Sequence, residues 1–350
     1  MKQIHKHGCT RRNLLKTFAG ASAGAMLHAQ AAQAKNAKQA GSTRRGRIDV
    51  HHHMMPAFQF PDSQWSPETS LGVMDKYGTE LAILSFVVPG TVIYDGSEKA
   101  RSMARQANEF GAKVASDYPK RFGFFAALPL REPDVSLKEI EYAFDTLKCD
   151  GIVLMSNAGD KWPGDPLFAS VFDELNRRKS AVFIHPAVAN CCRNIMPGIG
   201  EGVIEYDFDT TRAVTSLLFS GTLSRCQDIR WIVNHSGACV PVMAGRLKDR
   251  VPGVESSRIR GATEGKSDKT PNGVYYELKR LYYECAHATY PMPIAALRAF
   301  APPTQYLFGT DFPVEPYETT VDQIPSLNLP LEIQYALDRG NAERLWPRFK

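Results

Sequence analysis

Three consecutive histidines, at positions 51 to 53 in the stretch RIDVHHHMMP, are the residues of this sequence best suited to chemistry. They end a run that is typical of a β-strand, where side chains point alternately to opposite faces. His51 and His53 therefore share one face, and His52 packs behind the strand. Two neutral imidazoles on one face are typical metal ligands. An expression tag does not fit a run that lies inside the chain.

Three further polar residues come at the ends of apolar, strand-like runs: His185, His235 and Asp311. If these ends meet, four imidazoles and a carboxylate converge, and burying so many ionisable groups without a partner would be costly. A bound divalent ion offsets that cost. Mixed nitrogen and oxygen donors favour zinc, with manganese or iron also suited, whereas calcium and magnesium prefer oxygen ligands.

The elements that must position these residues alternate in type along the chain. Helical patterns with apolar residues three and four apart separate eight strand-like runs, several of them almost continuously apolar as in parallel sheets. The strands are expected at residues 47–53, 80–87, 121–129, 150–157, 181–187, 229–237, 281–288 and 305–313, with helices at 98–118, 135–148, 166–179 and 209–226.

This alternation predicts an α/β fold, a (β/α)8 barrel, in preference to an open doubly wound sheet. In such a barrel the carboxyl ends of all strands open onto one mouth, which would gather the histidines and Asp311. Residues 256–273 are rich in glycine and lysine and predict an exposed insertion. Residues 35–350 are expected to form a single domain.

Four segments resemble signature segments of the amidohydrolase-related decarboxylases, the family that includes aminocarboxymuconate semialdehyde decarboxylase and γ-resorcylate decarboxylase. They read IDVHHHMMP, FIHPA, IVNHSGACVPVMAGR and YLFGTDFP. Other segments, such as RFGFFAALPL and EYDFDTTRAVTSLLFSGTLSR, look most similar to 6-methylsalicylate decarboxylase-like proteins within that family. The resemblance covers essentially the whole chain after residue 34.

The resemblance implies a role for each matching residue. The family's metal ligands fall on His51, His53, His185 and Asp311, and its proton-transfer histidine falls on His235. Arg246 matches an arginine that binds the substrate carboxylate in the neighbouring subunit, which implies a homodimer. Two departures, Ser236-Gly237-Ala238 after His235 and the presence of His287, affect the pocket wall and therefore the choice of substrate.

The implied activity is the metal-dependent, non-oxidative decarboxylation of a small salicylate-like aromatic acid, with release of carbon dioxide. One divalent ion, zinc in preference to manganese, and no organic cofactor are expected. Asp311, assisted by His235, would protonate the ring carbon; burial raises and a metal lowers the pKa of such a carboxyl, so the sequence leaves its protonation open. The alternatives are a metal-dependent hydrolase of a lactone, ester or amide, and a binding protein without turnover.

The N-terminal segment 1–34 has the form of a twin-arginine signal peptide. Arg11 and Arg12 precede a mild apolar stretch that is too short to span a bilayer, and small residues ending at Ala34 suit cleavage. We therefore expect export of the folded protein by the twin-arginine translocase to the periplasm, with no membrane insertion after processing.

The charge of the chain also depends on this segment. The net charge of +5 comes from 42 basic and 37 acidic residues, and the segment holds five basic residues and no acid. The remainder is electrically balanced, so a nucleic acid partner is not expected. Among the seven cysteines, the adjacent Cys191 and Cys192 could be buried thiols, a vicinal disulfide or pocket lining; buried thiols are favoured.

Overall fold

The computed structural model describes residues 46–86, 95–159, 161–251 and 264–350. Gly46–Lys350 forms one compact unit. The expected signal peptide, residues 1–34, lies outside the described residues, and so do residues 256–263 of the expected insertion. The described part of that insertion, residues 264–273, consists mainly of turns, and most of its residues are exposed.

Eight parallel strands follow one another in a single sheet in the order of the sequence. They are β1 (Arg47–His53), β2 (Thr79–Ser85), β3 (Phe122–Ala127), β4 (Gly151–Met155), β5 (Ala181–His185), β6 (Arg230–Val233), β7 (Tyr282–Glu284) and β8 (Tyr306–Leu307). The sheet closes where Val50 N–H donates to Phe308 O (2.9 Å) and His53 N–H donates to Phe312 O (2.7 Å). The predicted (β/α)8 barrel is therefore confirmed.

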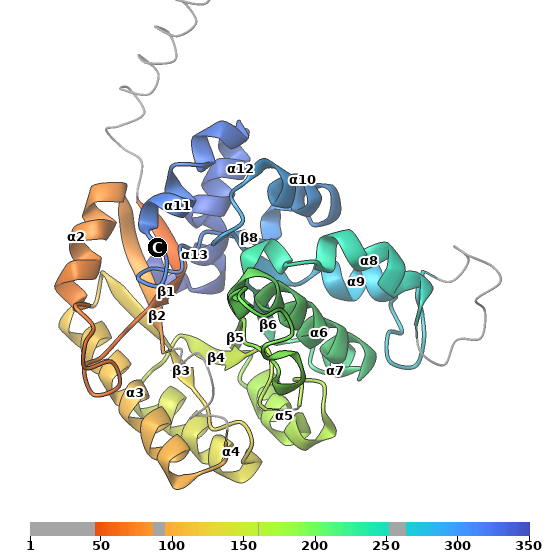
Figure 1. The fold of residues 1–350 in the computed structure, drawn as a ribbon, viewed down its shortest axis with the longest axis horizontal. Helices are drawn as coiled ribbons and strands as arrows, with labels where there is room; N and C mark the ends of the chain where they lie inside the picture. Colours follow the sequence, from red (N-terminus) through yellow and green to blue (C-terminus); the bar gives the residue numbers. More distant parts are fainter. Residues whose placement is uncertain (1–45, 87–94, 160, 252–263) are drawn as a thin grey trace, which may run out of the picture. The chain divides into compact units, whose positions relative to one another are not determined.

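Helices cover the outside of the strands (Figure 1). The α-helices are α2 (Pro67–Tyr77), α3 (Glu98–Asp117), α4 (Pro133–Glu141), α5 (Ala169–Arg177), α6 (Glu205–Phe219), α7 (Thr222–Arg225), α8 (Val240–Asp249), α9 (Val274–Lys279), α10 (Pro291–Phe300), α11 (Tyr317–Val321), α12 (Leu331–Tyr335) and α13 (Asn341–Leu345). Local sequence sets several of their ends. Ser66 caps α2 by accepting a hydrogen bond from Thr69 N–H, and Gly78 ends it at φ 70°.

The barrel interior is packed with aromatic side chains below the mouth. The Phe183 ring lies 4.8 Å from the His51 ring and 5.9 Å from the Phe125 ring. At the opposite end, the ring of Trp346 lies 5.8 Å from that of Phe125, and its Nε1–H donates to Asp150 O at 2.8 Å. The C-terminal segment therefore closes the end of the barrel away from the histidines.

Each predicted strand is present, but most are shorter than predicted. The expected strand 229–237 ends at Val233, because His235 and Ser236 have φ values of 51° and 54°. Similarly, the expected strand 305–313 is regular only at Tyr306–Leu307. His51, His53 and His185 therefore lie at the ends of strands, whereas His235, His287 and Asp311 lie in the turns that follow β6, β7 and β8.

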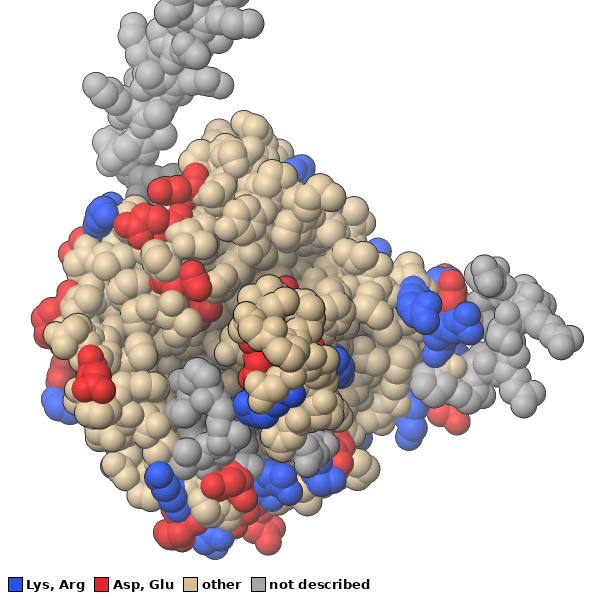
Figure 2. Space-filling view, in the orientation of Figure 1, with Lys and Arg blue, Asp and Glu red and all other residues tan. Residues whose placement is uncertain are grey.

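The surface and the cysteines agree only in part with the sequence predictions. Acidic and basic side chains both occur on the face shown in Figure 2. Among the described residues, no helix is long and apolar enough to cross a membrane.

Cys191 and Cys192 are free thiols with sulfur atoms 3.2 Å apart. Cys192 is buried as favoured, but Cys191 is exposed, because the turn after β5 directs the two adjacent side chains differently.

Candidate metal centre

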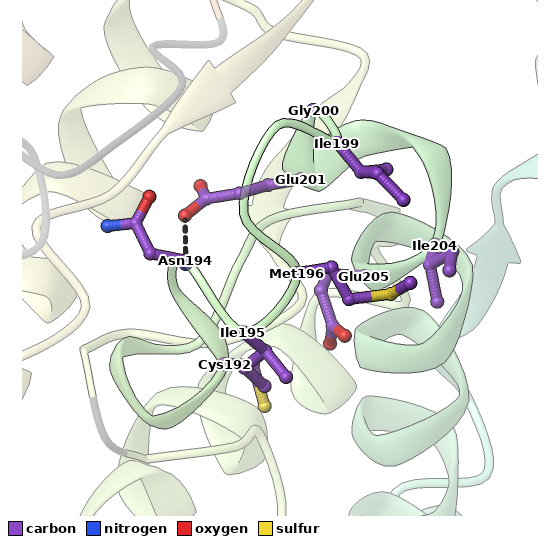
Figure 3. Close-up of a pocket in the computed structure, with 9 residues that line it drawn as sticks. All are labelled: Cys192, Asn194, Ile195, Met196, Ile199, Gly200, Glu201, Ile204 and Glu205. Carbon is purple, nitrogen blue, oxygen red and sulfur yellow. Dashed lines mark hydrogen bonds between the residues drawn. The ribbon is translucent and has the colours of Figure 1, made fainter.

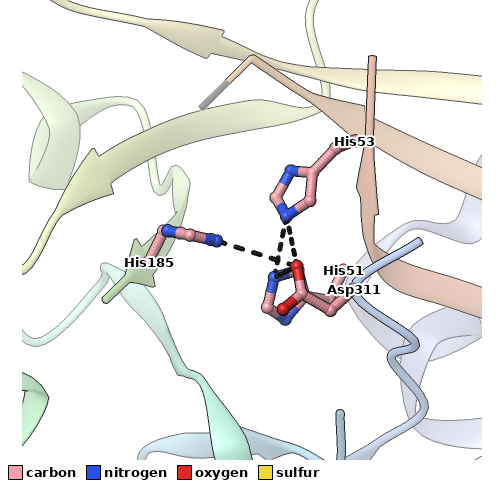
Figure 4. A group of neighbouring side chains, drawn as sticks. All are labelled: His51, His53, His185 and Asp311. Atoms are coloured by element: carbon pink, nitrogen blue, oxygen red, sulfur yellow. Dashed lines mark hydrogen bonds and ion pairs between the residues drawn. The ribbon is translucent and has the colours of Figure 1, made fainter. Parts of the chain in front are cut away.

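Four side chains converge at the mouth of the barrel, and we call them the primary donor group: His51, His53, His185 and Asp311 (Figure 4). One ligand atom from each lies within 4.8 Å of all the others. Asp311 Oδ1 lies 2.6 Å from His53 Nε2, 3.1 Å from His51 Nε2 and 4.0 Å from His185 Nε2. All four side chains are buried. The structure therefore brings together the four residues that the sequence singled out as ligands.

The three imidazoles of this group are oriented by hydrogen bonds at their other nitrogen. His51 Nδ1–H donates to Glu284 Oε1 at 2.9 Å, and His185 Nδ1–H donates to Pro186 O at 3.0 Å. His53 Nδ1 lies 2.9 Å from Ser85 Oγ. Each ring is thereby held with Nε2 toward the common centre, as is typical of metal-ligating histidines.

The chemistry of this donor set fits a divalent metal ion. His185 Nε2 is buried and has no hydrogen-bond partner among the described residues. An unpaired polar atom in this position is costly unless something binds it. Three imidazole nitrogens and one carboxylate oxygen match the ligands of zinc or another transition metal. The arrangement is a metal-binding site made of histidine and aspartate side chains.

The charges of the group follow from its burial and close contacts. Burial by itself would lower the pKa of His51, but Asp311 and Glu284 outweigh it and raise that pKa to about 10. Burial lowers the pKa of His185 to about 3 and also lowers the pKa of His53. Burial would raise the pKa of Asp311, but His51 and hydrogen bonds from histidines hold it well below its usual value. Asp311 is therefore ionised near neutral pH.

Two more histidines stand beside the primary donor group, and both are held in an unusual backbone conformation. His235, His287 and Asp311 have φ values of 51°, 55° and 64°, which residues other than glycine rarely adopt. Such strain is common where a turn must direct a side chain into an active site. The His235 and His287 ring centroids are 4.9 Å apart. His287, a departure from the family pattern, donates from Nε2–H to Asp311 Oδ2 at 2.9 Å.

His235 is oriented in the same way as the ligand histidines. Its Nδ1–H donates to Asp207 Oδ1 at 3.1 Å, and its Nε2 is buried without a partner among the described residues. His235 belongs, with His287 and Asp311, to a second set of residues whose ligand atoms lie within 4.8 Å of one another. His235 therefore lies beside the primary donor group, and its role in proton transfer stays a prediction.

Sequence reasoning missed two carboxylates that organise the site. Glu284 binds His51 Nδ1 and also accepts hydrogen bonds from the backbone N–H groups of His235 and Ala286. Asp49 accepts hydrogen bonds from His52 Nδ1–H at 3.0 Å and from Thr310 Oγ1 at 2.6 Å. Glu284 and Asp49 are acidic residues inside apolar, strand-like runs, and this unusual position is the signal in the sequence that could have revealed them. His52 itself is buried behind β1, as expected.

Arg246 is placed differently from the other predicted residues. It is exposed on α8, whereas the metal centre is buried. Met243 and Leu247 of the same helix line an apolar cavity of about 550 Å³. The loop after β5 forms a separate cavity of about 20 Å³ beside Cys192, which holds no more than about one water molecule and excludes an aromatic acid (Figure 3). The role of Arg246 in substrate binding stays a prediction.

The chain matches the amidohydrolase family model over residues 48–348 and belongs to this family. It is 33% identical over 334 residues to decarboxylase yanB of Aspergillus niger, covering 87% of this chain and 88% of that protein. It is 30% identical over 325 residues to the 6-methylsalicylic acid decarboxylase of Penicillium expansum, covering 87% and 97%. The crystal structure of 5-carboxyvanillate decarboxylase from Novosphingobium aromaticivorans, complexed with manganese, superposes with a TM-score of 0.72 at 18% identity and covers 88% of this chain and 97% of that chain.

Fold, metal centre and relatives together define the class of the protein. It is a metal-dependent carboxy-lyase of the amidohydrolase superfamily. The resemblance read from the sequence is thereby confirmed at the level of the family.

Proposed function

We propose that this protein decarboxylates a small aromatic acid with a hydroxyl group ortho to the carboxylate and releases carbon dioxide. The observation that carries the proposal is the convergence of three oriented imidazoles and Asp311 at the barrel mouth, in a chain whose relatives include a 6-methylsalicylic acid decarboxylase. We propose zinc or manganese as the ion. The donor set suits zinc, and manganese is named for the 5-carboxyvanillate decarboxylase structure.

The primary donor group would hold the ion, and Arg246 of a second subunit would bind an anionic group of the substrate. When bound, the ion supplies positive charge for the carboxylate and the ortho hydroxyl, and so fixes the ring. The protein must then protonate the ring carbon that bears the carboxylate, because direct loss of carbon dioxide leaves an aryl carbanion.

Asp311 and His235 are the residues that we propose for this proton transfer. Asp311 is ionised in the resting protein, since its pKa is held well below the usual value. The proton that it delivers must therefore come first from the substrate hydroxyl, and His235 Nε2 would accept that proton and pass it to Asp311. The His235 and Asp311 donor atoms lie within 4.8 Å of each other, and Asp207 keeps His235 Nε2 turned toward the site. Carbon-carbon cleavage then restores the aromatic ring.

The test compares substrates with and without the ortho hydroxyl. Metal-loaded and chelator-treated protein are incubated with 6-methylsalicylate, 2,6-dihydroxybenzoate, 2-methylbenzoate, a lactone and an ester. We expect metal-dependent carbon dioxide release from the hydroxylated acids only, with deuterium at the former carboxyl carbon when the reaction runs in D₂O. Turnover of the lactone or ester alone would establish a hydrolase. Tight metal binding without any turnover would establish a binding protein.

A further inference from the structure

A second set of donors lies beside the primary donor group, and we call it the outer donor group: His235, His287 and Asp311. The three residues come from the turns after β6, β7 and β8, and their donor atoms all lie within 4.8 Å of one another. His235 and Asp311 are buried, whereas the His287 side chain is 32% exposed. The outer donor group is therefore open toward the mouth.

One distance within the outer donor group suits two cis ligands of one ion. Ligand atoms at about 2.1 Å from an ion and at right angles lie roughly 3.0 Å apart. His287 Nε2 and Asp311 Oδ2 lie 2.9 Å apart. Glu315 Oε1, 3.9 Å from His287 Nε2, offers a further oxygen at the open side.

His235 supplies an independent observation that points to a ligand of this group. Its Nε2 is buried and has no partner among the described residues. Only 9% of the His235 side chain is exposed. Its Nδ1–H is fixed by Asp207 Oδ1 at 3.1 Å. The same pattern of one anchored nitrogen and one free nitrogen occurs at His185 in the primary donor group.

Asp311 divides its two oxygens between the groups. Oδ1 faces His51 and His53 at 3.1 Å and 2.6 Å, whereas Oδ2 faces His287 at 2.9 Å. A carboxylate with one oxygen in each of two donor groups is suited to bridge two ions about 3.5–4 Å apart.

We propose that the outer donor group binds a second divalent metal ion, bridged by Asp311 to the ion of the primary donor group. The positions that the three side chains leave open would take water or an oxygen of a bound anion. Occupancy engages His235 Nε2, which the proposed reaction uses for proton transfer, so a second ion should slow decarboxylation. That consequence rests on the proposed function, whereas the second site itself does not.

The test is the number of ions bound by the metal-free full chain on titration with Mn²⁺ alone. We expect stepwise binding of about two ions per chain in the wild type and about one in His287→Ala. His287→Phe is the second variant, because its ring fills a similar space but carries no atom that can bind a metal. This variant should also bind about one ion, and the exchange-coupled Mn²⁺ signal of the wild type in electron paramagnetic resonance should be lost from both variants.

Retention of the tighter ion shows that the variants are folded. Saturation of the wild type at one ion would overturn the second site. A second ion that persists in both His287 variants would also overturn it, because that ion would be an adventitious ion only. None of these outcomes depends on turnover, so failure of the second site and failure of the proposed function are distinguishable.

Discussion

At the scale of single residues, the orientation of His51 depends on Glu284. This carboxylate accepts a hydrogen bond from His51 Nδ1–H at 2.9 Å, and both groups are fully buried. Its second oxygen accepts a hydrogen bond from Ala286 N–H at 2.7 Å. Glu284, at the end of β7, therefore orients a proposed ligand on β1 and is itself held by the backbone N–H of Ala286.

Removing the charge of Glu284 should weaken metal binding. We expect Glu284→Gln to reduce metal affinity about 10- to 100-fold, because an outer hydrogen-bond partner raises the basicity of its ligand and holds its ring. The measurement is competition for the metal with a chelator. Glu318→Gln, at an exposed ion pair with Lys76, is the control and should bind like the wild type. Unchanged affinity in Glu284→Gln would contradict the role of Glu284.

The protonation of His51 predicts how metal binding depends on pH. In the metal-free protein the pKa of His51 is raised to about 10, so Nε2 carries a proton at pH 8. A metal ligand must be neutral, and His53 and His185 are already neutral because their pKa values are lowered.

We expect metal binding at pH 8 to release about one proton, and affinity to rise about tenfold per pH unit up to the pKa of His51. Calorimetry in two buffers with different ionisation enthalpies measures the released proton. Equal binding enthalpies in both buffers would show that His51 is neutral before the metal arrives.

At the scale of elements, β6, β7 and β8 are short, and the turns after them position His235, His287 and Asp311. The segment after β8 shows this most clearly. Asp311 N–H donates to His51 O at 2.7 Å, and Thr310 Oγ1–H donates to Asp49 at 2.6 Å. The turn that carries Asp311 is thereby fastened to the strand that carries two of its proposed co-ligands.

Close packing of this turn makes Gly309 a sensitive position. A Cβ atom there would overlap Glu284 Oε2 and would lie 2.8 Å from His51 Cβ. We expect Gly309→Ala to lower the free energy of unfolding by about 1–3 kcal/mol and to weaken metal binding. Thermal unfolding and metal analysis measure the two effects.

Gly72 provides a matched control in α2. A Cβ atom at that position meets nothing within 4 Å, and alanine favours a helix by up to about 1 kcal/mol over glycine. Gly72→Ala should therefore be neutral or stabilising, with normal metal content. Equal behaviour of the two variants would show that the turn after β8 can relax.

At the scale of the whole molecule, the place of Arg246 raises the question of a second subunit. Arg246 is exposed on α8, so we predict that it completes the site of a neighbouring copy. In mixtures of Arg246→Ala and His185→Ala chains, one subunit keeps the metal centre and the other supplies the arginine. Random exchange should restore activity at about a quarter of the sites. Activity no higher than that of the separate variants would contradict action across the interface.

Export is a second property of the whole chain, and it rests on the segment 1–34. Folding and metal loading before export avoid competition from copper(II), which binds nitrogen-rich sites more tightly than zinc. We predict that replacing Arg11 and Arg12 by lysine leaves active, metal-loaded protein in the cytoplasm. Cell fractionation measures its location, and the wild-type chain is the control. Normal export of the double variant would exclude a twin-arginine signal.

The sequence by itself determined the fold class, the eight strands and the identity of the converging residues His51, His53, His185 and Asp311. It could do so because hydrophobic periodicity is local and because parallel strands in a barrel share one mouth. Alternation along a strand was also enough to separate His52 from its two neighbours.

Only the tertiary structure decided which atoms meet. The contact of Glu284 with His51 joins residues 233 positions apart, and no local pattern specifies such a distance. The left-handed turns at His235, His287 and Asp311 ended strands earlier than apolar patterning predicts. The turn after β8 also places the two carboxylate oxygens of Asp311 in different donor groups. Contacts of this kind depend on the closure of the barrel, which brings distant turns within hydrogen-bonding range only after the whole chain has folded.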